Sequence, residues 1–228
     1  MTDPLRVIRL GLVEYQAALA LQQRVRAARQ ADAIPDTMLL LEHPPVLTRG
    51  RRKSPEDLPM GDAWYRANGI DVVDVDRGGK VTYHGPGQLV GYPIVRVTDV
   101  VGFVRDMEQA IISALAHEQV EAHSRTCEGP DFTGVWVEDR KIASIGVHVA
   151  KGVTTHGFAV NVQNDMQPWN WIVACGLPEV QMTSLYMETG RPERLEPFTA
   201  RIIEAFSARL DRETFEADAA DLGALATG

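Results

Sequence analysis

The chain is short of cysteine. Only Cys127 and Cys175 occur in its 228 residues, and they form neither a CxxC pair nor a disulfide framework. The chain also lacks the apolar core of a signal peptide and any run of about 18 apolar residues that would span a membrane. We therefore expect a reducing, cytoplasmic environment and no association with the membrane.

Positive charge is also scarce. The 23 Lys and Arg residues stand against 31 Asp and Glu residues, which gives a formal net charge of −8. Such a surface repels a polyanion, so general nucleic-acid binding is not expected. The hydrophobic content of 45% is that of an ordinary globular protein. The length favours a single domain over residues 1–228, with a core over about 5–210 and a frayed end after Phe215.

The hydrophobic pattern predicts helices and hairpins in a mixed order. Apolar residues recur every three or four positions from Val13 to Ala28, from Val101 to Leu115 and from Phe198 to Leu210, which is typical of amphipathic helices. Asp99 is the expected cap of the second of these helices. A fourth, short helix is predicted from Ser54 toward Trp64.

The strands are predicted from β-branched and apolar runs bounded by turn residues. These runs cover 5–10, 37–41, 71–75, 88–97, 133–137 and 141–149, with a further strand that ends at Asn161. Hairpins together with segregated helices favour an α+β fold over an alternating βαβ sheet.

The segment from Arg77 to Gln88 holds four glycines and a proline around a single histidine, His84. Residues without a Cβ allow a ligand to lie against backbone N–H groups, but the same composition also suits a pair of tight turns. The spacing does not fit a phosphate-binding loop, and strand-like residues follow where a dinucleotide site needs a helix.

Two side chains are candidates for catalysis. Cys175 precedes Gly176, so its sulfur could face an open turn as a nucleophile, or it could be a small buried apolar residue. Lys141 opens an apolar strand directly after a turn, where it could shift a neighbouring thiol toward the thiolate or simply be solvated. Cys127 has no comparable flanks. No HExxH or similar ligand pair occurs, so metal binding is not expected.

Six motifs occur along the chain in the order and near the spacing that they have in the lipoyl(octanoyl) transferase family, and the chain therefore resembles that family. They are Leu41-Glu42-His43-Pro44, the segment from Arg77 to Gln88, Lys141 to Val147, His156 to Asn161, Ala174-Cys175-Gly176 and Thr183-Ser184-Leu185. The resemblance implies the catalytic-domain fold of biotin and lipoate protein ligases: a large mixed β-sheet and a smaller sheet, flanked by helices.

The resemblance also implies an activity and its partners. The family moves an octanoyl group from octanoyl-acyl carrier protein to a lysine of lipoyl domains, in 2-oxoacid dehydrogenases and in the glycine-cleavage H protein. Residue by residue, it implies Cys175 as the nucleophile and Lys141 as the residue that lowers the thiol pKa. The implied substrate-binding residues are Arg77, Gly78, Gly79, Lys80, Val81, Thr82, Tyr83, His84, Ser144, Ile145, Gly146, Gly157, Phe158 and Ala159.

This chemistry needs no ATP, metal or other cofactor, because one thioester exchanges readily for another. Three alternatives stay open at this point. The chain could be an ATP-dependent lipoate or biotin protein ligase, a non-catalytic module that binds lipoyl domains, or a thioesterase. A basic loop from Arg49 to Lys53 could be a solvated surface loop or could steer an acidic carrier protein toward the site.

Overall fold

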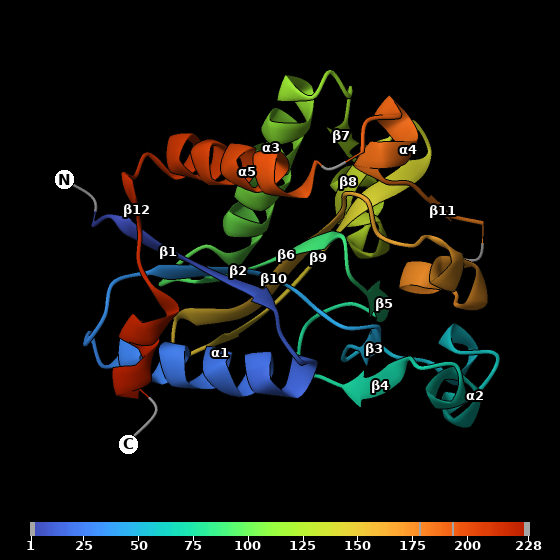
Figure 1. Ribbon diagram of the computed structural model, residues 1–228, viewed down its shortest axis with the longest axis horizontal. Helices are drawn as coiled ribbons and strands as arrows, with labels where there is room; N and C mark the ends of the chain where they lie inside the picture. The colour runs from blue at the N-terminus through green and yellow to red at the C-terminus, as the bar shows by residue number, and fades with distance from the viewer. Residues whose placement is uncertain (1–2, 178, 193, 226–228) are drawn as a thin grey trace.

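A large mixed sheet runs through the middle of the molecule (Figure 1). The computed structural model describes residues 3–177, 179–192 and 194–225, without the side chain of Cys175 or those of residues 223–225. Neighbouring strands of the large sheet follow the order β12 (Thr214–Glu216), β1 (Leu5–Leu12), β2 (Thr37–Glu42), β6 (Gln88–Ile94), β10 (Val153–Asn161), β9 (Arg140–Ala150), β8 (Gly134–Val137) and β7 (His123–Ser124), and β11 (Gln181–Met182) also pairs with β9.

A second, three-stranded sheet lies beside the first. It has the order β4 (Asp71–Asp74), β3 (Val46–Arg49) and β5 (Val81–His84). Strand β3 is parallel to β4 and antiparallel to β5. The mixture of parallel and antiparallel pairs in both sheets is that of the α+β class predicted from the sequence.

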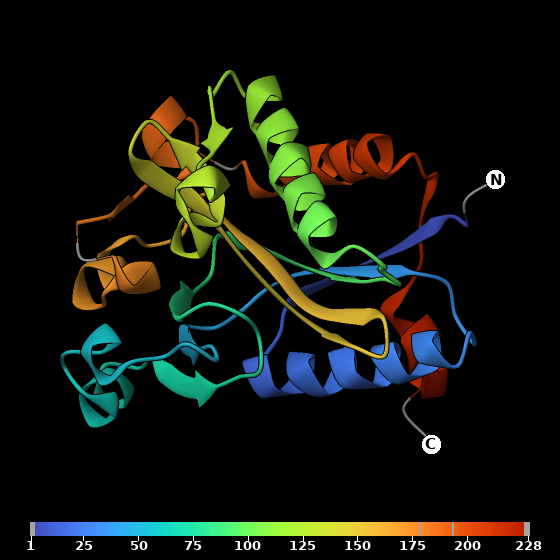
Figure 2. The same ribbon diagram turned by 180° about the vertical axis from the view of Figure 1, so that it is seen from behind.

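Helices cover both faces of the large sheet (Figures 1 and 2). Helices α3 (Val100–His117) and α5 (Leu195–Leu210) pack together over one face, and α1 (Tyr15–Gln30) covers the other. Two helices are shorter. Helix α2 (Asp62–Ala67) lies beside the small sheet, and α4 (Leu185–Thr189) lies near β7 and β8. Short 3-10 segments are η1 (Pro55–Asp57), η2 (Thr126–Glu128), η3 (Pro130–Phe132), η4 (Gln167–Trp171), η5 (Ala174–Gly176) and η6 (Ala219–Leu225).

Local sequence signals account for several helix ends. The carboxylate of Asp99 accepts a hydrogen bond of 2.9 Å from the N–H of Gly102, which confirms its predicted role as the cap of α3. Ser54 also caps as predicted, with a capping box to Asp57. The helix that it begins, however, ends after one turn, and α2 starts separately after Gly61. The prediction of one continuous helix was therefore wrong at this point.

The C-terminal segment differs from the sequence expectation as well. Residues after Phe215 were expected to be frayed, but η6 packs on α1 and Leu222 is buried in the same apolar cluster as Val25. An Ala/Asp-rich segment with only two leucines, Leu222 and Leu225, gives little periodic signal, although the burial of Leu222 is enough to hold a short turn against a helix. The part of the chain that the structure describes thus stays packed to this residue.

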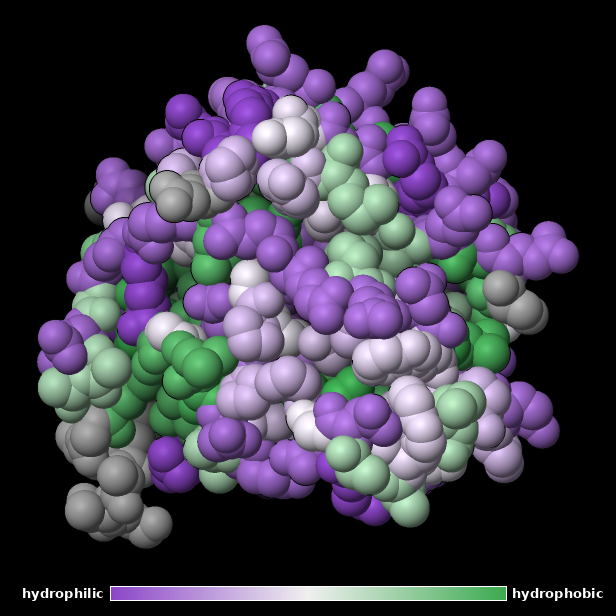
Figure 3. All heavy atoms as spheres, turned by 45° about the vertical axis from the view of Figure 1, so that its right-hand side comes forward, coloured by the Kyte–Doolittle hydropathy of each residue, from purple (hydrophilic) through white to green (hydrophobic). Residues whose placement is uncertain are grey.

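Within the described residues, no helix is long and apolar enough to cross a membrane. Hydrophilic side chains cover most of the face in Figure 3, and apolar ones form separate patches between them. The cytoplasmic location expected from the sequence stays a prediction.

Phe206 of α5 is central to the core beneath the sheet. It is 1% exposed, and its ring stacks on that of Phe158 in β10 with centroids 5.2 Å apart. We expect Phe206→Ala to lower the free energy of unfolding by about 3–5 kcal/mol, because it leaves a cavity as well as losing buried apolar area. Urea unfolding followed by circular dichroism measures this. The control is Phe215→Ala, whose ring is 42% exposed; equal losses in the two variants would contradict the assignment of the core.

Candidate active site

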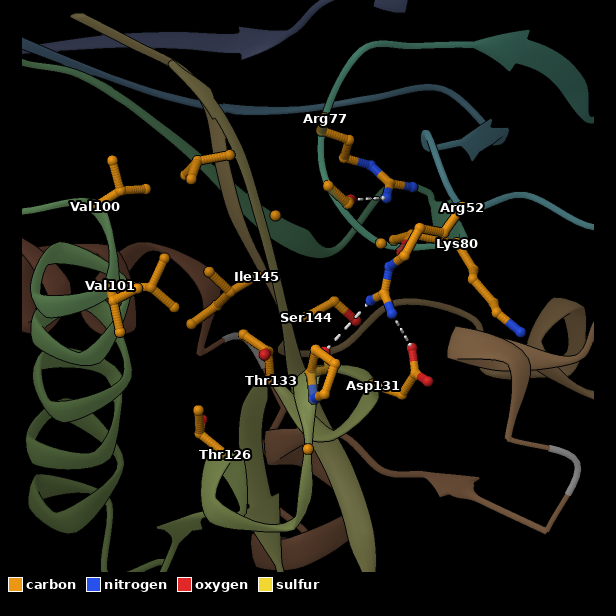
Figure 4. A pocket seen from close by; sticks show the side chains of 18 of the residues that line it. Arg52, Arg77, Lys80, Val100, Val101, Thr126, Asp131, Thr133, Ser144 and Ile145 are labelled. Carbon is orange, nitrogen blue, oxygen red and sulfur yellow. Dashed lines mark hydrogen bonds and ion pairs between the residues drawn. The ribbon is translucent and has the colours of Figure 1, made fainter. Parts of the chain in front are cut away.

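A cavity of about 620 Å³ lies between β9, the first turns of α3 and the glycine-rich loop before β5 (Figure 4). Its walls are apolar along α3 and β9, while Arg52, Lys80 and Arg105 bring positive charge to it. A smaller cavity of about 30 Å³ shares Arg77, Thr82 and residues 144–146 with it and ends on Tyr15, His84, Tyr92 and His156. Together the two cavities form a site of the size that suits a small-molecule substrate.

The structure brings most of the sequence-predicted substrate-binding residues to these two cavities. Those on the main cavity are Arg77, Gly78, Gly79, Lys80, Val81, Thr82, Ser144, Ile145 and Gly146. Those on the smaller cavity alone are His84, Gly157, Phe158 and Ala159. Segments far apart in the sequence therefore meet at one place.

Tyr83 is the exception. Side chains alternate along β5, so Thr82 and His84 face the cavities while Tyr83 points into the core of the small sheet. Its ring lies edge-on to Trp169, with centroids 5.9 Å apart. The family motif includes Tyr83, but the structure places this side chain away from the cavity walls.

Lys141 is buried in the cavity wall rather than solvated. The side chain on β9 is 1% exposed, and its Nζ lies 5.3 Å from the centroid of the Trp136 ring. A Cβ on Gly134 would lie 2.6 Å from Cε of Lys141, and Gly134 has φ of +135°, so only glycine fits there. Burial of a lysine in an otherwise apolar wall is costly, which is typical of a functional residue.

Cys175 lies in the short turn η5, and its side chain is outside the described part of the structure. The turn is held by a hydrogen bond of 3.0 Å from the N–H of Val173 to the carbonyl oxygen of Asp57, and by the burial of Ala174 in the core of the small sheet. It packs against β5 and against η3, whose Pro130 and Asp131 line the cavity. The backbone of Cys175 is therefore placed beside the cavity.

Arg77 holds the glycine-rich loop in shape. Its guanidinium is buried and donates to the carbonyl oxygen and the hydroxyl of Thr48, at 2.7 and 2.8 Å. The backbone N–H groups of residues 50–52 donate to the carbonyl oxygens of residues 80, 77 and 79. A Cβ on Gly50 would lie 2.8 Å from the Arg77 guanidinium, so the close approach of the two loops requires glycine there. The basic loop thus supports the cavity wall.

The charges of that basic loop are mostly paired. Arg52 forms an ion pair of 2.8 Å with Asp131 across the cavity (Figure 4), and Lys53 pairs with Asp74 at 2.6 Å. Arg51 hydrogen-bonds to His148 at 3.1 Å. Partial neutralisation by the chain's own acids weakens the interpretation of this loop as a docking site for an acidic carrier.

Neutral histidines lie at the floor of the small cavity and behind it: His84 lines the cavity, and the ring of His43 lies next to that of His84, with centroids 5.6 Å apart. Nδ1–H of His43 donates to the carbonyl oxygen of Val13 at 2.7 Å, so Nε2 must accept from the hydroxyl of Tyr92, also at 2.7 Å. Burial lowers the pKa of His43 to about 4 and the pKa of His84 well below its usual value. The sequence motifs include His43, but they did not predict that Tyr15 of α1 and Tyr92 of β6 line the small cavity.

His156 and Asp76 form a second polar contact next to this floor. Nε2 of His156 donates to the carboxylate of Asp76 at 2.7 Å. This hydrogen bond lowers the pKa of Asp76 to about 2, while burial lowers the pKa of His156. His156 has φ of +58°, an uncommon backbone conformation for a residue other than glycine. No group of three or more metal-ligating side chains is found among the described residues.

Comparison with known proteins identifies the family. A model of the lipoyl protein ligase A/B catalytic domain matches residues 14–207. The octanoyltransferase of Mycolicibacterium smegmatis is 43% identical over 219 residues, which cover 92% of this chain and 91% of the relative. That of Acidothermus cellulolyticus is 47% identical over 189 residues, or 79% of this chain and 80% of the relative. The chain therefore belongs to the lipoyl protein ligase A/B catalytic-domain family, and within it to the octanoyltransferases.

Solved structures show the same fold at low sequence identity. Lipoate-protein ligase A bound with ATP matches with a TM-score of 0.77 at 16% identity, over 98% of this chain and 92% of that one. A biotin protein ligase from Aquifex aeolicus matches with a TM-score of 0.53 at 12% identity, over 90% and 69% respectively. The fold predicted from the resemblance, with one large mixed sheet and one small sheet, is confirmed.

The buried neutral His43 makes stability depend on pH. The unfolded chain binds a proton at this residue near pH 6.5, but the folded chain does so only near pH 4. The contribution of the neutral His43 to the free energy of unfolding is therefore complete above pH 6.5. As the pH falls toward 4, this contribution of roughly 3 kcal/mol is lost. Urea unfolding of the wild type and of His43→Asn at several pH values measures this. The variant should lose less stability over that interval, and parallel curves would contradict the assignment.

Proposed function

We propose that this octanoyltransferase carries the octanoyl group as a thioester on Cys175 before passing it to a lysine side chain. The observation that carries the proposal is the buried Lys141 in the wall of a largely apolar cavity, beside the turn that holds Cys175. A free thiol is mostly protonated at neutral pH, so a nearby ammonium is needed to favour the reactive thiolate.

The walls of the cavity suit an acyl chain. Val101 and Val104 of α3 face Ile145 and Val147 of β9 across it, and the glycines of the loop at 78–79 allow close approach. The hydroxyl of Ser144 is buried, lines both cavities and has no hydrogen-bond partner among the described residues. It is therefore available to a polar group of the substrate, since a buried hydroxyl gains by being paired.

The reaction has two steps. The Cys175 thiolate attacks the carbonyl carbon of the donor thioester, and the bond from that carbon to the donor sulfur breaks. The departing sulfur takes a proton from the Lys141 ammonium, which leaves Lys141 neutral. The amine of the acceptor lysine then attacks the enzyme thioester, the bond to the Cys175 sulfur breaks, and the amine proton passes to a neutral Lys141. Both thioesters have similar free energies, so the first step is readily reversible until the donor departs.

The donor and the acceptor are proteins in this proposal. We infer octanoyl-acyl carrier protein as the donor, and lipoyl domains of 2-oxoacid dehydrogenases together with the glycine-cleavage H protein as the acceptors, from the family to which the chain belongs. The shared fold also admits the ATP-dependent reaction, because a lipoate-protein ligase A bound with ATP matches over 98% of the chain. The two reactions differ in whether an enzyme thioester forms.

Intact mass spectrometry separates the candidate functions. After incubation with octanoyl-acyl carrier protein and no ATP, we expect the enzyme to gain one octanoyl group, which an added lipoyl domain then removes as octanoyl-lysine. An absolute requirement for ATP without an enzyme adduct would favour a ligase. Release of free octanoate would favour a thioesterase, and stable binding without transfer would favour a binding module.

Cys175→Ser should abolish both the adduct and the transfer. The hydroxyl of serine has a much higher pKa than a thiol and no matched base beside it, so we expect turnover to fall by several orders of magnitude. The matched control is Cys127→Ser, because Cys127 is the exposed cysteine on η2 and does not line the cavity. Normal turnover by Cys175→Ser together with loss of turnover in Cys127→Ser would contradict the assignment, because the nucleophile would then be Cys127.

Lys141→Met should raise the pH at which Cys175 reacts with iodoacetamide, because the adjacent positive charge is gone. Lys141→Arg should keep a larger fraction of Cys175 as the thiolate than Lys141→Met does. It should not restore proton transfer from the acceptor amine, since a guanidinium does not lose its proton near neutral pH. The alkylation rate against pH and the rate of amine transfer are measured for each variant, after thermal unfolding confirms that each is folded. An alkylation profile unchanged in Lys141→Met would contradict this role.

A further inference from the structure

A second lysine reaches the Cys175 turn from the opposite wall of the cavity. Lys80 belongs to the glycine-rich loop, whereas Lys141 lies on β9. Figure 4 shows the Lys80 side chain extending away from Arg52 and Asp131. The resemblance described above implies that Lys80 binds substrate, but it gives the ammonium no role in the chemistry of the transfer.

The contact of Lys80 with the turn is direct. A Cβ built on Gly176 would overlap with Nζ and Cδ of Lys80 and would lie 2.6 Å from Cε. Gly176 also has φ of +70°, a conformation that favours glycine. The residue after the nucleophile therefore has two reasons to be glycine, and one of them is the space that the Lys80 side chain occupies.

The charge of Lys80 is not used by the protein itself. Among the described residues, its ammonium forms no ion pair and no hydrogen bond, although most cations of this acidic chain are paired with carboxylates. Arg52, its neighbour on the cavity wall, is paired with Asp131. A half-buried, unpaired ammonium beside a reactive turn is available to a negative charge that appears only during the reaction.

We propose that the Lys80 ammonium binds the acyl carbonyl oxygen during both steps of the transfer and stabilises its negative charge. This inference rests on the proposed function. When the Cys175 sulfur bonds to the carbonyl carbon, the π electrons of the carbonyl move to its oxygen, and that oxyanion accepts a hydrogen bond from Nζ. The oxygen regains its double bond as the donor sulfur leaves with the electrons of the broken bond. The same charge appears again when the acceptor amine attacks.

Lys80→Met tests the charge alone, because methionine keeps much of the aliphatic packing on Gly176 and removes the ammonium. The measured reaction is the single-turnover formation of the enzyme thioester from octanoyl-pantetheine, a small neutral donor that excludes effects of protein docking. We expect this rate to fall about 10- to 100-fold. Lys80→Arg should recover part of the loss, since it restores a cationic donor.

Alkylation by iodoacetamide is the second readout. It needs the thiolate but forms no oxyanion, so its dependence on pH should be the same in Lys80→Met as in the wild type. A role of Lys80 in packing would lower both rates together, and a role in ionising Cys175 would shift the alkylation profile. Either result would overturn the proposal.

Arg105→Met is the matched control. Arg105 is a second cation that lines the same cavity and has no ion pair among the described residues, but it lies on α3 and is not among the atoms nearest to a Cβ on Gly176. Its loss removes one positive charge from the same cavity without removing the contact on the turn, so we expect a much smaller fall in the rate of thioester formation than in Lys80→Met. Equal losses in the two variants would show that only the general positive field of the cavity matters. If the wild type forms no thioester, the proposed function fails; if the wild type and Lys80→Met form it equally fast, only the role of Lys80 fails.

Discussion

The burial of the Lys141 side chain in an apolar wall is the constraint around which the rest of the site is arranged. A buried ammonium is tolerated only where its surroundings use it, and here it lies against Trp136 on β8, beside a glycine that leaves room for it. Lys141 pairs with Trp136 of β8 on one side and with Met182 of β11 on the other, so the lysine is held by backbone pairing on both sides. A rigid strand thus fixes the position of the charge that, in the proposed function, favours the Cys175 thiolate.

The second requirement is close approach of backbone to backbone. Gly91 of β6 pairs with Phe158 of β10, whose ring fills the space that a side chain on Gly91 would take. A Cβ on Gly157 would overlap with the backbone of Gly91 and lie 2.5 Å from the ring of Pro93. On the other side, Gly87 accepts close contact with residues 163–164 while its N–H donates to Glu42 at 2.6 Å. These contacts set the floor of the site, and they explain why the motifs are rich in glycine.

Sequence patterns predicted much of this arrangement, and the parts they missed have physical reasons. The cap at Asp99 and the strand that begins near Lys141 follow from local chemistry, and so were predictable. The direction of Tyr83 depends on which face of a short strand meets the cavity, and a single-residue shift reverses it. Tyr92 and Tyr15 reach the small cavity only through tertiary packing. The pairing of Lys53 with Asp74 likewise joins residues that no sequence pattern relates.

The central claim is that the enzyme thioester lies on the reaction path, and its kinetic competence is the most direct test. The octanoylated enzyme is prepared, freed of donor, and mixed rapidly with a lipoyl domain without ATP. The account predicts that octanoyl appears on one lysine of the domain at least as fast as in steady-state turnover, while the enzyme returns to its unmodified mass. Transfer much slower than turnover, or none until ATP is added, would contradict the account.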